Sequence, residues 1–421
     1  MTALLFLFML INFADKVVVG LAAVPLTRDL GLTPEQFGDI GSAFFLLFAV
    51  SAIVVGFVSN RVQTKNTLLV MAIIWSIVQF PMLGMVSLET LIVCRVILGA
   101  GEGPASPVAT HALYKWFPDR LRGLPTAIIA QGSAFGVIVA VPLLNWIIDA
   151  YSWHWAFGAL GIAGLAWALL WLIFGREGTL VDAPVAPGGG GTGGTERVPY
   201  RYLLTRPTIV AVCAAGFASY WGLALALTWF TSYLVTGLGF SQKVGGNLTV
   251  LPWLFGAAVV LGGGYLSQRL KAKGASSRLC RGVLPCIAIV AGGCALPFVG
   301  SMPAPGLKIA VLVFGAAIGS TIFVVLPMLV SELTPQPQRA AMLAITTSIV
   351  TFAGVLAPRI TGSIIQNAPT PVAGYEQGFV ILGILLIAGG VIGLLFIRPE
   401  ADRKRLAAHA VSAPPLQPVR T

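Results

Sequence analysis

Two charged residues, Arg95 and Glu102, lie within an apolar stretch between Glu89 and His111 that is long enough to cross a bilayer. They stand seven residues apart, close to two turns of an α-helix, so both side chains project from one face roughly 10 Å apart along the axis. An ionisable group in hydrocarbon is costly unless it faces a bundle interior or a watery cavity. The pair therefore predicts a polar site inside a membrane, with a structural ion pair as the alternative.

A second charged pair, Asp15 and Lys16, interrupts the first apolar stretch. It lies about twelve residues, or roughly 18 Å, from the start of that stretch, and Glu102 reaches a similar depth about thirteen residues from the other side. The shared depth predicts one site built from Asp15, Lys16, Arg95 and Glu102, although Asp15 could also form a structural pair with either cation. Together with Arg359, the intramembrane cations outnumber the acids, and this surplus of positive charge favours an anion such as a carboxylate.

The amino-acid composition is strongly hydrophobic, so the few charged residues within apolar stretches are informative. The chain has 421 residues, of which 57% are hydrophobic and only 10% are charged, with a mean hydropathy of +0.89. Soluble domains carry about a quarter of charged residues, so we expect a polytopic membrane protein in a lipid bilayer. The net charge of +11 could suggest nucleic acid as a partner, but the sequence contains no soluble domain with a basic face.

The sequence offers little to a metal or to enzymatic chemistry. The five cysteines lie in or beside apolar stretches without the paired spacing of metal ligands, and the three histidines are scattered. No combination of nucleophile, base and oxyanion donors is apparent. We therefore expect no metal, no cofactor other than a coupling ion, and no enzymatic activity.

Apolar runs of about 20 residues predict twelve membrane spans. The first run lacks a basic n-region and is interrupted by charge, so we expect a retained span rather than a signal peptide. The predicted spans lie near residues 3–25, 36–59, 67–86, 89–113, 124–149, 155–175, 207–235, 242–268, 281–300, 306–333, 340–366 and 376–397.

The basic residues predict the orientation of these spans. Of the 26 Lys and Arg residues, twenty fall on the side that carries both ends of the chain, and only Arg28, Lys243 and Lys308 fall on the other side. Loops rich in Lys and Arg stay in the cytoplasm. We therefore expect a multi-pass protein of the cell inner (plasma) membrane with both termini cytoplasmic.

The spans divide into two halves. A Gly- and Pro-rich stretch that includes Gly188–Gly191 predicts a flexible linker, and the tail beyond Pro399 is predicted to be disordered. The predicted organisation is an N-terminal six-helix half at 1–180, a cytoplasmic linker at 181–206, a C-terminal six-helix half at 207–398 and a cytoplasmic tail at 399–421.

The halves also repeat in sequence. Gly56–Arg61 is echoed by Gly264–Arg269, and a second set recurs at a constant offset of 217: Pro118, Arg122, Ala127, Ile128 and Phe135 reappear as Pro335, Arg339, Ala344, Ile345 and Phe352. Parallel repeats of this kind enclose a central cavity near the bilayer midplane. We expect an all-α integral membrane protein with twelve transmembrane helices in two pseudo-symmetric halves around that cavity.

The motifs resemble those of the major facilitator superfamily, and within it the anion:cation symporter branch of sugar-acid, phthalate and vesicular glutamate carriers. The resemblance rests on Asn12–Lys16, on Trp229, Phe230, Tyr233 and Leu234, and most specifically on Arg95, Gly99, Glu102, Gly103, Pro107, Trp116, Phe117, Pro118, Arg122 and Gly123. Members usually carry a short polar lead before the first span, so the resemblance also implies that this end is truncated.

The resemblance implies roles for the charged residues. Lys16 and Arg95 would bind the substrate anion, and Asp15 and Glu102 would take part in proton coupling. Lys16 departs from the branch, which prefers Arg there and thereby gains a rigid two-pronged grip on a carboxylate.

Four further residues are candidates for substrate binding: Tyr220, Trp229, Gln131 and Arg359. Tyr220 and Trp229 could equally be packing residues, Gln131 is ambiguous, and Arg359 could extend to the membrane interface instead. Glu332 with Arg339, and Asp119 with Arg120 or Arg122, lie at the inner ends of their spans. These residues are candidates for gating ion pairs.

Together these features predict a secondary active transporter that takes up a small organic anion, such as a sugar acid or an aromatic acid, by alternating access. We expect proton coupling and a monomer. Export of drugs or other solutes, and a non-transporting membrane sensor, are the alternatives.

Overall fold

The computed structural model describes residues 1–58, 62–118, 121–180, 198–335 and 338–412. Within these ranges every regular element is a helix, and 12 segments are long and apolar enough to cross a membrane. A helix satisfies its own backbone groups, which is what a segment without water around it requires. The predicted all-helical membrane fold is therefore confirmed.

The helices of the N-terminal half pack closely around Arg95 and Glu102. Pro104 has no backbone N–H, and the helix breaks there directly after Glu102. A Cβ at Gly99 would lie 1.8 Å from the carbonyl oxygen of Phe44, so only glycine allows this approach between α6 and α3. The elements are α1 (Thr2–Leu21), α2 (Ala23–Asp29), α3 (Pro34–Leu46), α4 (Phe48–Val58), α5 (Thr64–Ile77), η1 (Phe80–Leu83), α6 (Leu88–Glu102), α7 (Ala105–Tyr114), α8 (Gly123–Ala150) and α9 (Trp153–Phe174).

The C-terminal half is interrupted more often. Such breaks at membrane depth are tolerated where neighbouring helices cover the freed backbone groups. Its elements are α10 (Tyr200–Leu204), α11 (Pro207–Thr228), α12 (Phe230–Ser232), η3 (Tyr233–Gly237), α13 (Gln242–Leu248), α14 (Leu251–Ala272), η4 (Arg278–Val283), α15 (Leu284–Ala295), η5 (Leu296–Phe298), α16 (Pro305–Ala317), η6 (Ile318–Thr321), α17 (Ile322–Leu333), α18 (Arg339–Thr351), α19 (Ala353–Asn367), α20 (Pro371–Phe396) and α21 (Pro399–Ser412).

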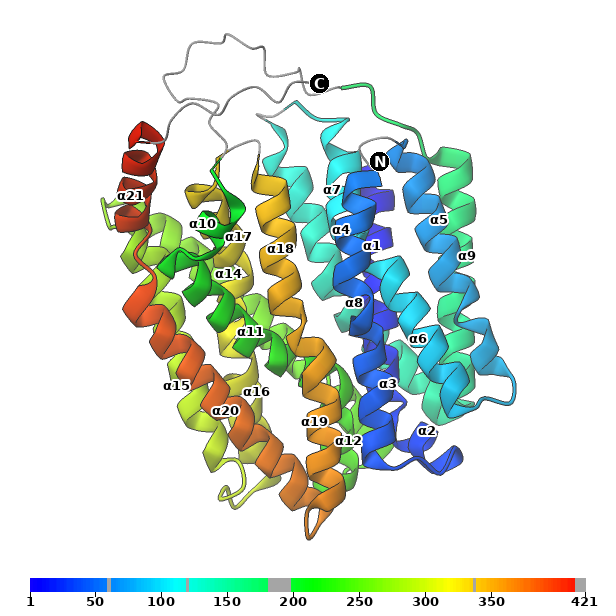
Figure 1. The fold of residues 1–421 in the computed structure, drawn as a ribbon. Helices are drawn as coiled ribbons and strands as arrows, with labels where there is room; N and C mark the ends of the chain where they lie inside the picture. Colours follow the sequence, from blue (N-terminus) through cyan, green and yellow to red (C-terminus); the bar gives the residue numbers. More distant parts are fainter. Residues whose placement is uncertain (59–61, 119–120, 181–197, 336–337, 413–421) are drawn as a thin grey trace.

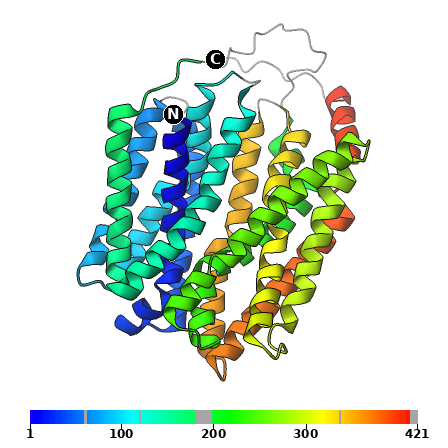
Figure 2. The same cartoon turned by 180° about the vertical axis from the view of Figure 1, so that it is seen from behind.

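The two halves stand beside each other and meet most closely at one end (Figure 1 and Figure 2). We call the end that carries Met1, α10 and α21 the terminal face, and the other end the opposite face. Near the opposite face α3 packs against α19 and α8 packs against α13, so both halves contribute to the closure. Toward the terminal face the helices of the two halves diverge.

The internal repeat is visible in side-chain contacts. Arg122 Nε donates a hydrogen bond of 3.0 Å to the carbonyl of Phe117, and Arg339 Nε donates one of 3.1 Å to the carbonyl of Thr334. Both the donors and the acceptors are related by the offset of 217 found in the sequence. The two halves therefore repeat a local structure as well as a motif.

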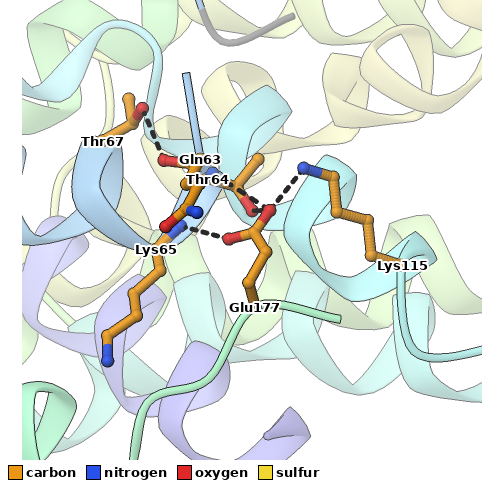
Figure 3. A network of polar contacts seen from close by, with 6 residues as sticks. All are labelled: Gln63, Thr64, Lys65, Thr67, Lys115 and Glu177. Atoms are coloured by element: carbon orange, nitrogen blue, oxygen red, sulfur yellow. Dashed lines mark hydrogen bonds and ion pairs between the residues drawn. The ribbon is translucent and has the colours of Figure 1, made fainter. Parts of the chain in front are cut away.

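At the terminal face, Glu177 joins the ends of three spans (Figure 3). It accepts hydrogen bonds from the backbone N–H groups of Thr64 and Lys65 at 3.2 and 2.8 Å, from the Thr64 hydroxyl, and from Lys115 Nζ at 2.5 Å. Burial raises the pKa of the Glu177 carboxyl, but these hydrogen bonds outweigh it and leave the pKa below its usual range. Glu177 thus holds the start of α5 to the end of α7.

The prediction of a disordered tail was wrong for α21. Asp402 Oδ2 accepts a hydrogen bond of 3.0 Å from the backbone N–H of Thr208, and Glu400 Oε1 accepts one of 3.0 Å from that of Arg278. These acids satisfy free N–H groups at the starts of α11 and η4, where a negative charge is also favoured. Residues 413–421 lie outside the described residues, as do residues 181–197 of the linker predicted at 181–206, whose described end carries α10.

Candidate functional site

Helices α1 and α6 bring the four predicted charged residues together. Lys16 Nζ lies 3.6 Å from Glu102 Oε2, and Arg95 Nη1 lies 3.5 Å from the backbone oxygen of Asp15. All four residues are buried, with exposed fractions of 9% or less. The shared depth deduced from the sequence therefore corresponds to direct proximity within the N-terminal half.

Two uncharged residues complete this polar group. Asn12 Oδ1 accepts a hydrogen bond of 2.7 Å from Lys16 Nζ, and Gln79 Nε2 donates one of 2.8 Å to Asp15 Oδ1. Neither residue is among the site residues predicted from the sequence. Asn12 could have been found, because it precedes Lys16 by one helical turn on the same face. Gln79, between α5 and η1, belongs to no motif, and no signal in the sequence points to it.

Aromatic rings cover the two cations. Lys16 Nζ lies 4.1 Å from the ring centroid of Phe13 and 5.4 Å from that of Phe48, and the Arg95 guanidinium lies 4.7 Å from the centroid of Phe44. A ring face attracts a cation without neutralising it. The rings therefore stabilise buried positive charge and leave it available to an anion.

The site has unused hydrogen-bonding capacity. Within the described part of the chain, Arg95 Nε, Asp15 Oδ2, Asn12 Nδ2 and both carboxylate oxygens of Glu102 are buried without a hydrogen-bond partner. Buried polar atoms are normally paired, because an unmade hydrogen bond costs about 1–3 kcal/mol. Unpaired donors and acceptors therefore lie within one buried group, where they can bind a polar ligand.

Arg359 lies apart from this group. At the opposite face its Nη1 lies 3.3 Å from Asp39 Oδ1 and its Nη2 lies 3.8 Å from Glu35 Oε1, so it links α19 to α3 across the two halves. The Arg359 side chain is 62% exposed. The expected surplus of cations over acids depended on Arg359, and it is not present in the group of Asp15, Lys16, Arg95 and Glu102.

The remaining substrate candidates are distributed over both halves. Tyr220 is half-buried on α11, with its ring centroid 5.8 Å from that of Phe45 on α3. Trp229 is buried near the opposite face, where its Nε1 donates a hydrogen bond of 3.0 Å to the carbonyl of Pro358. Gln131 is half-buried on α8, a helix that packs against α1. Of these residues, Tyr220 contacts Phe45, which in turn packs against two of the rings that cover the cations.

The structure pairs the predicted gating residues differently. Glu332 accepts hydrogen bonds from Arg281 at 2.7 Å and Ser277 at 3.0 Å, and in this structure it does not pair with Arg339. Arg339 instead bonds to a backbone carbonyl of its own loop, as Arg122 does. Such loops are fixed locally, and neither contact crosses between the halves. The predicted partners Asp119 and Arg120 lie outside the described residues.

Other chemistry finds little support in the described part of the chain. It contains no group of three or more His, Cys, Asp or Glu side chains that could hold a metal ion. Its five cysteines are free thiols in this structure. The functional residues that remain are therefore the buried charges and the rings around them.

Comparison with known proteins agrees with this architecture. The family model of the Major Facilitator Superfamily matches residues 4–358. The hexuronate transporter of Bacillus subtilis is 27% identical over 94% of each chain, and the probable sulfoacetate transporter of Cupriavidus necator is 28% identical over 92% of this chain and 91% of its own. Among solved structures, a bacterial homologue of the human lysosomal transporter Spinster, in an inward-facing and unoccupied conformation, has a TM-score of 0.77 at 19% identity, covering 96% of this chain and 97% of its own.

The family match covers most of the chain. The alignments with the two transporters extend over nearly the full length of both. The protein therefore belongs to the Major Facilitator Superfamily and is similar to the sugar-acid and anion transporters of that family.

Proposed function

We propose that this protein imports a small organic carboxylate together with protons, as a monomer in the plasma membrane with its terminal face toward the cytoplasm. The observation that carries the proposal is the buried group of Lys16, Arg95 and Glu102 with its unpaired polar atoms. The names of the relatives, which are transporters of hexuronate and sulfoacetate, support an anionic substrate. The excess of Lys and Arg on the side of the terminal face supports the orientation.

The charge balance of the site links the anion to a proton. Lys16 and Arg95 stand against Asp15 and Glu102, so the four charges cancel. A carboxylate would add an uncompensated negative charge in a buried setting, which is costly. If Glu102 takes up a proton as the carboxylate binds, the two cations again match two negative charges. This exchange predicts one proton for each monocarboxylate.

Lys16 is the cation for which the substrate carboxylate and the ionised Glu102 carboxylate would compete. Its ammonium lies 3.6 Å from Glu102 Oε2, close enough to stabilise the ionised carboxylate. A substrate carboxylate that binds Lys16 would weaken this attraction and favour protonation of Glu102. By linkage, protonation of Glu102 must then favour binding of the substrate.

Alternating access would require the contacts at the opposite face to separate. These contacts join α3 to α19 and α8 to α13, and Arg359 adds ion pairs to Asp39 and Glu35. We propose that the two halves rock about the central site, as parallel repeats in transporters allow. The structure, with its halves apart at the terminal face, would then correspond to the form that faces the cytoplasm.

Uptake into proteoliposomes tests the function as a whole. Labelled sugar acids, aromatic acids and dicarboxylates would be offered with and without an inward proton gradient. We expect one class of carboxylate to accumulate only with the gradient. Gradient-driven movement of cationic drugs without uptake of any carboxylate would contradict the proposal and favour export.

Neutralising either cation tests its role in binding. Truncating one partner of a buried charge pair costs about 2–5 kcal/mol, so Lys16→Ala and Arg95→Ala should each weaken substrate affinity about thirtyfold or more. Lys16→Arg should retain uptake, because it keeps the charge and adds the two-pronged grip. Lys308→Ala is the matched control, since Lys308 pairs with Glu376 within one half. Normal affinity in both alanine variants would remove the assignment.

Glu102→Gln tests the coupling, because an amide resembles the protonated carboxyl in size and charge. The variant should still bind and exchange substrate but should not accumulate it when a pH gradient is imposed. Asp15→Asn is the comparison, since Asp15 lies in the same group. Accumulation that survives in Glu102→Gln and disappears in Asp15→Asn would transfer the role to Asp15.

A further inference from the structure

The rings that cover the cations continue from the N-terminal half into the C-terminal half. Phe45 packs against both Phe44 and Phe48, with ring centroids 4.9 and 6.2 Å away. On its other side it meets Tyr220 of α11 at 5.8 Å, edge to face, and Tyr220 in turn meets Phe323 of α17 at 6.0 Å. One chain of aromatic contacts therefore leads from Arg95 and Lys16 across to the other half.

A second aromatic contact crosses the halves at Lys16. Phe13, which lies against the Lys16 ammonium, meets Trp253 of α14 with ring centroids 6.3 Å apart and planes at 89°. Within the described residues the indole Nε1–H of Trp253 is buried without a hydrogen-bond partner. A buried indole N–H normally finds an acceptor, so this donor is available to a ligand between the halves.

Phe44 and Phe45 are buried, but five other rings of this cluster keep part of their surface exposed. Phe13, Phe48, Tyr220, Trp253 and Phe323 are all half-buried, although they lie in the interior of a helical bundle. Each keeps part of its surface free while touching a ring of the same cluster. A flat apolar group that entered between the halves would meet ring faces and edges on both sides.

Four hydroxyl groups of α11 and α18 are engaged by their own helices. Thr228 donates to the carbonyl of Ala224, and Thr346, Ser348 and Thr351 bond in the same way to carbonyls three or four residues earlier. A polyhydroxylated acid needs several free polar partners, because each of its hydroxyls loses water on binding. These hydroxyls of α11 and α18 therefore have no donor left for a sugar, whereas Tyr220, Trp253 and Phe323 of the same half keep part of their ring surface exposed, which favours an aromatic substrate body.

We propose that the substrate is an aromatic monocarboxylate, an inference that rests on the proposed function and narrows its substrate class. The carboxylate would bind Lys16 and Arg95, and the ring would pack against the exposed parts of Phe48, Tyr220 and Trp253. Trp253 Nε1–H would donate to a polar substituent of the ring. One carboxylate suits the charge balance, because a single proton on Glu102 compensates one negative charge.

Binding to the purified full-length protein tests this assignment. Benzoate and 4-hydroxybenzoate would be compared with cyclohexanecarboxylate, which has a similar size but no aromatic ring, and with glucuronate and galactonate. We expect benzoates to bind at least about tenfold more tightly than the sugar acids, a difference of about 1.4 kcal/mol. Tighter binding of glucuronate or galactonate than of either benzoate would overturn the inference but leave the proposed function intact. Failure of every carboxylate to bind would instead count against the proposed function itself.

Variants identify the residues that recognise the ring. An aromatic pair contributes about 0.5–1.5 kcal/mol beyond its buried area, so Tyr220→Leu and Trp253→Leu should each weaken benzoate binding between about twofold and tenfold. Binding of cyclohexanecarboxylate should change less, which separates ring recognition from a general loss of structure. Trp146→Leu, an exposed tryptophan on α8 outside the cluster, should leave both affinities unchanged.

Trp253→Phe keeps a ring and removes only the N–H donor. It should weaken binding of 4-hydroxybenzoate more than that of benzoate, and it serves as the test if Trp253→Leu does not fold. Equal losses for benzoate and cyclohexanecarboxylate in the leucine variants, together with no selective loss in Trp253→Phe, would show that these residues only pack the bundle. That result would overturn the assignment of an aromatic substrate.

Discussion

The ion pairs of Arg359 make a specific prediction about the closure at the opposite face. Arg359→Gln removes both links from α19 to α3, at 3.3 Å to Asp39 and 3.8 Å to Glu35. Because the arginine side chain is 62% exposed, solvent screens both pairs. Exposed pairs contribute about 0.2–1 kcal/mol each, so their joint loss should favour separation at this face by roughly 1 kcal/mol, or about fivefold.

The closure can be measured as a distance across the opposite face. Spin labels at Arg28 in the N-terminal half and Ser301 in the C-terminal half, in a background without the native cysteines, report whether the halves are together or apart. Arg359→Gln should raise the separated population about fivefold. The gain should shrink in high salt, and a further Asp39→Asn substitution should add little, because its partner is already gone.

A matched control decides whether the effect belongs to the interface. Lys308 pairs with Glu376 at 2.7 Å, but both residues belong to the C-terminal half. Lys308→Gln therefore removes an ion pair without removing a link between the halves, and it should leave the distance distribution unchanged. An unchanged distribution in Arg359→Gln, or an equal shift in Lys308→Gln, would refute the reasoning.

Two further predictions concern packing and acid stability. A Cβ at Gly38 would lie 2.5 Å from the carbonyl oxygen of Pro358, so Gly38→Leu should hold α3 away from α19 and cost about 1–3 kcal/mol of closure, seen with the same labels as a mostly separated population. Glu177→Gln should lower the thermal unfolding temperature at neutral pH, because the charged hydrogen bonds to α5 and Lys115 are lost. The pKa of Glu177 is depressed in the folded protein, so its contribution is present above the unfolded-state pKa and is lost as pH falls through the folded-state value. The difference in unfolding temperature between wild type and Glu177→Gln should therefore vanish in acid, and a difference that persists there would contradict the assignment.

The sequence was sufficient for the spans and for the charged group. Apolar runs and the distribution of Lys and Arg depend only on the solvent that each segment meets, so they can be counted without a structure. Asp15, Lys16, Arg95 and Glu102 could be grouped because helical rise fixes the depth of each residue. The depth of each residue and the helix face that it occupies were enough to predict this grouping, because α1 and α6 are neighbours within one half.

Contacts between distant segments could not be predicted in the same way. Arg359 has the same charge whether it faces a substrate or an acid of the other half, and only the packing of α19 on α3 selects Asp39 and Glu35. Glu332 likewise pairs with Arg281 and not with Arg339, which is closer in sequence, because η4 starts beside the end of α17. Trp253 carries no charge and fits no motif, so nothing separated it from an ordinary packing residue.

The division of residues between the halves limits how coupling could work. Lys16 and Glu102 belong to the same half, so if the halves rock as rigid bodies their separation of 3.6 Å stays the same in both forms. The rocking motion alone could then not release the proton from Glu102. What rocking changes is the contact of the N-terminal site with Tyr220 and Trp253 of the other half. In the proposed mechanism, a substrate carboxylate that leaves these rings would no longer engage the Lys16 ammonium, which would then stabilise the ionised Glu102 carboxylate at an unchanged distance. The proposed coupling would therefore require substrate recognition by the C-terminal half.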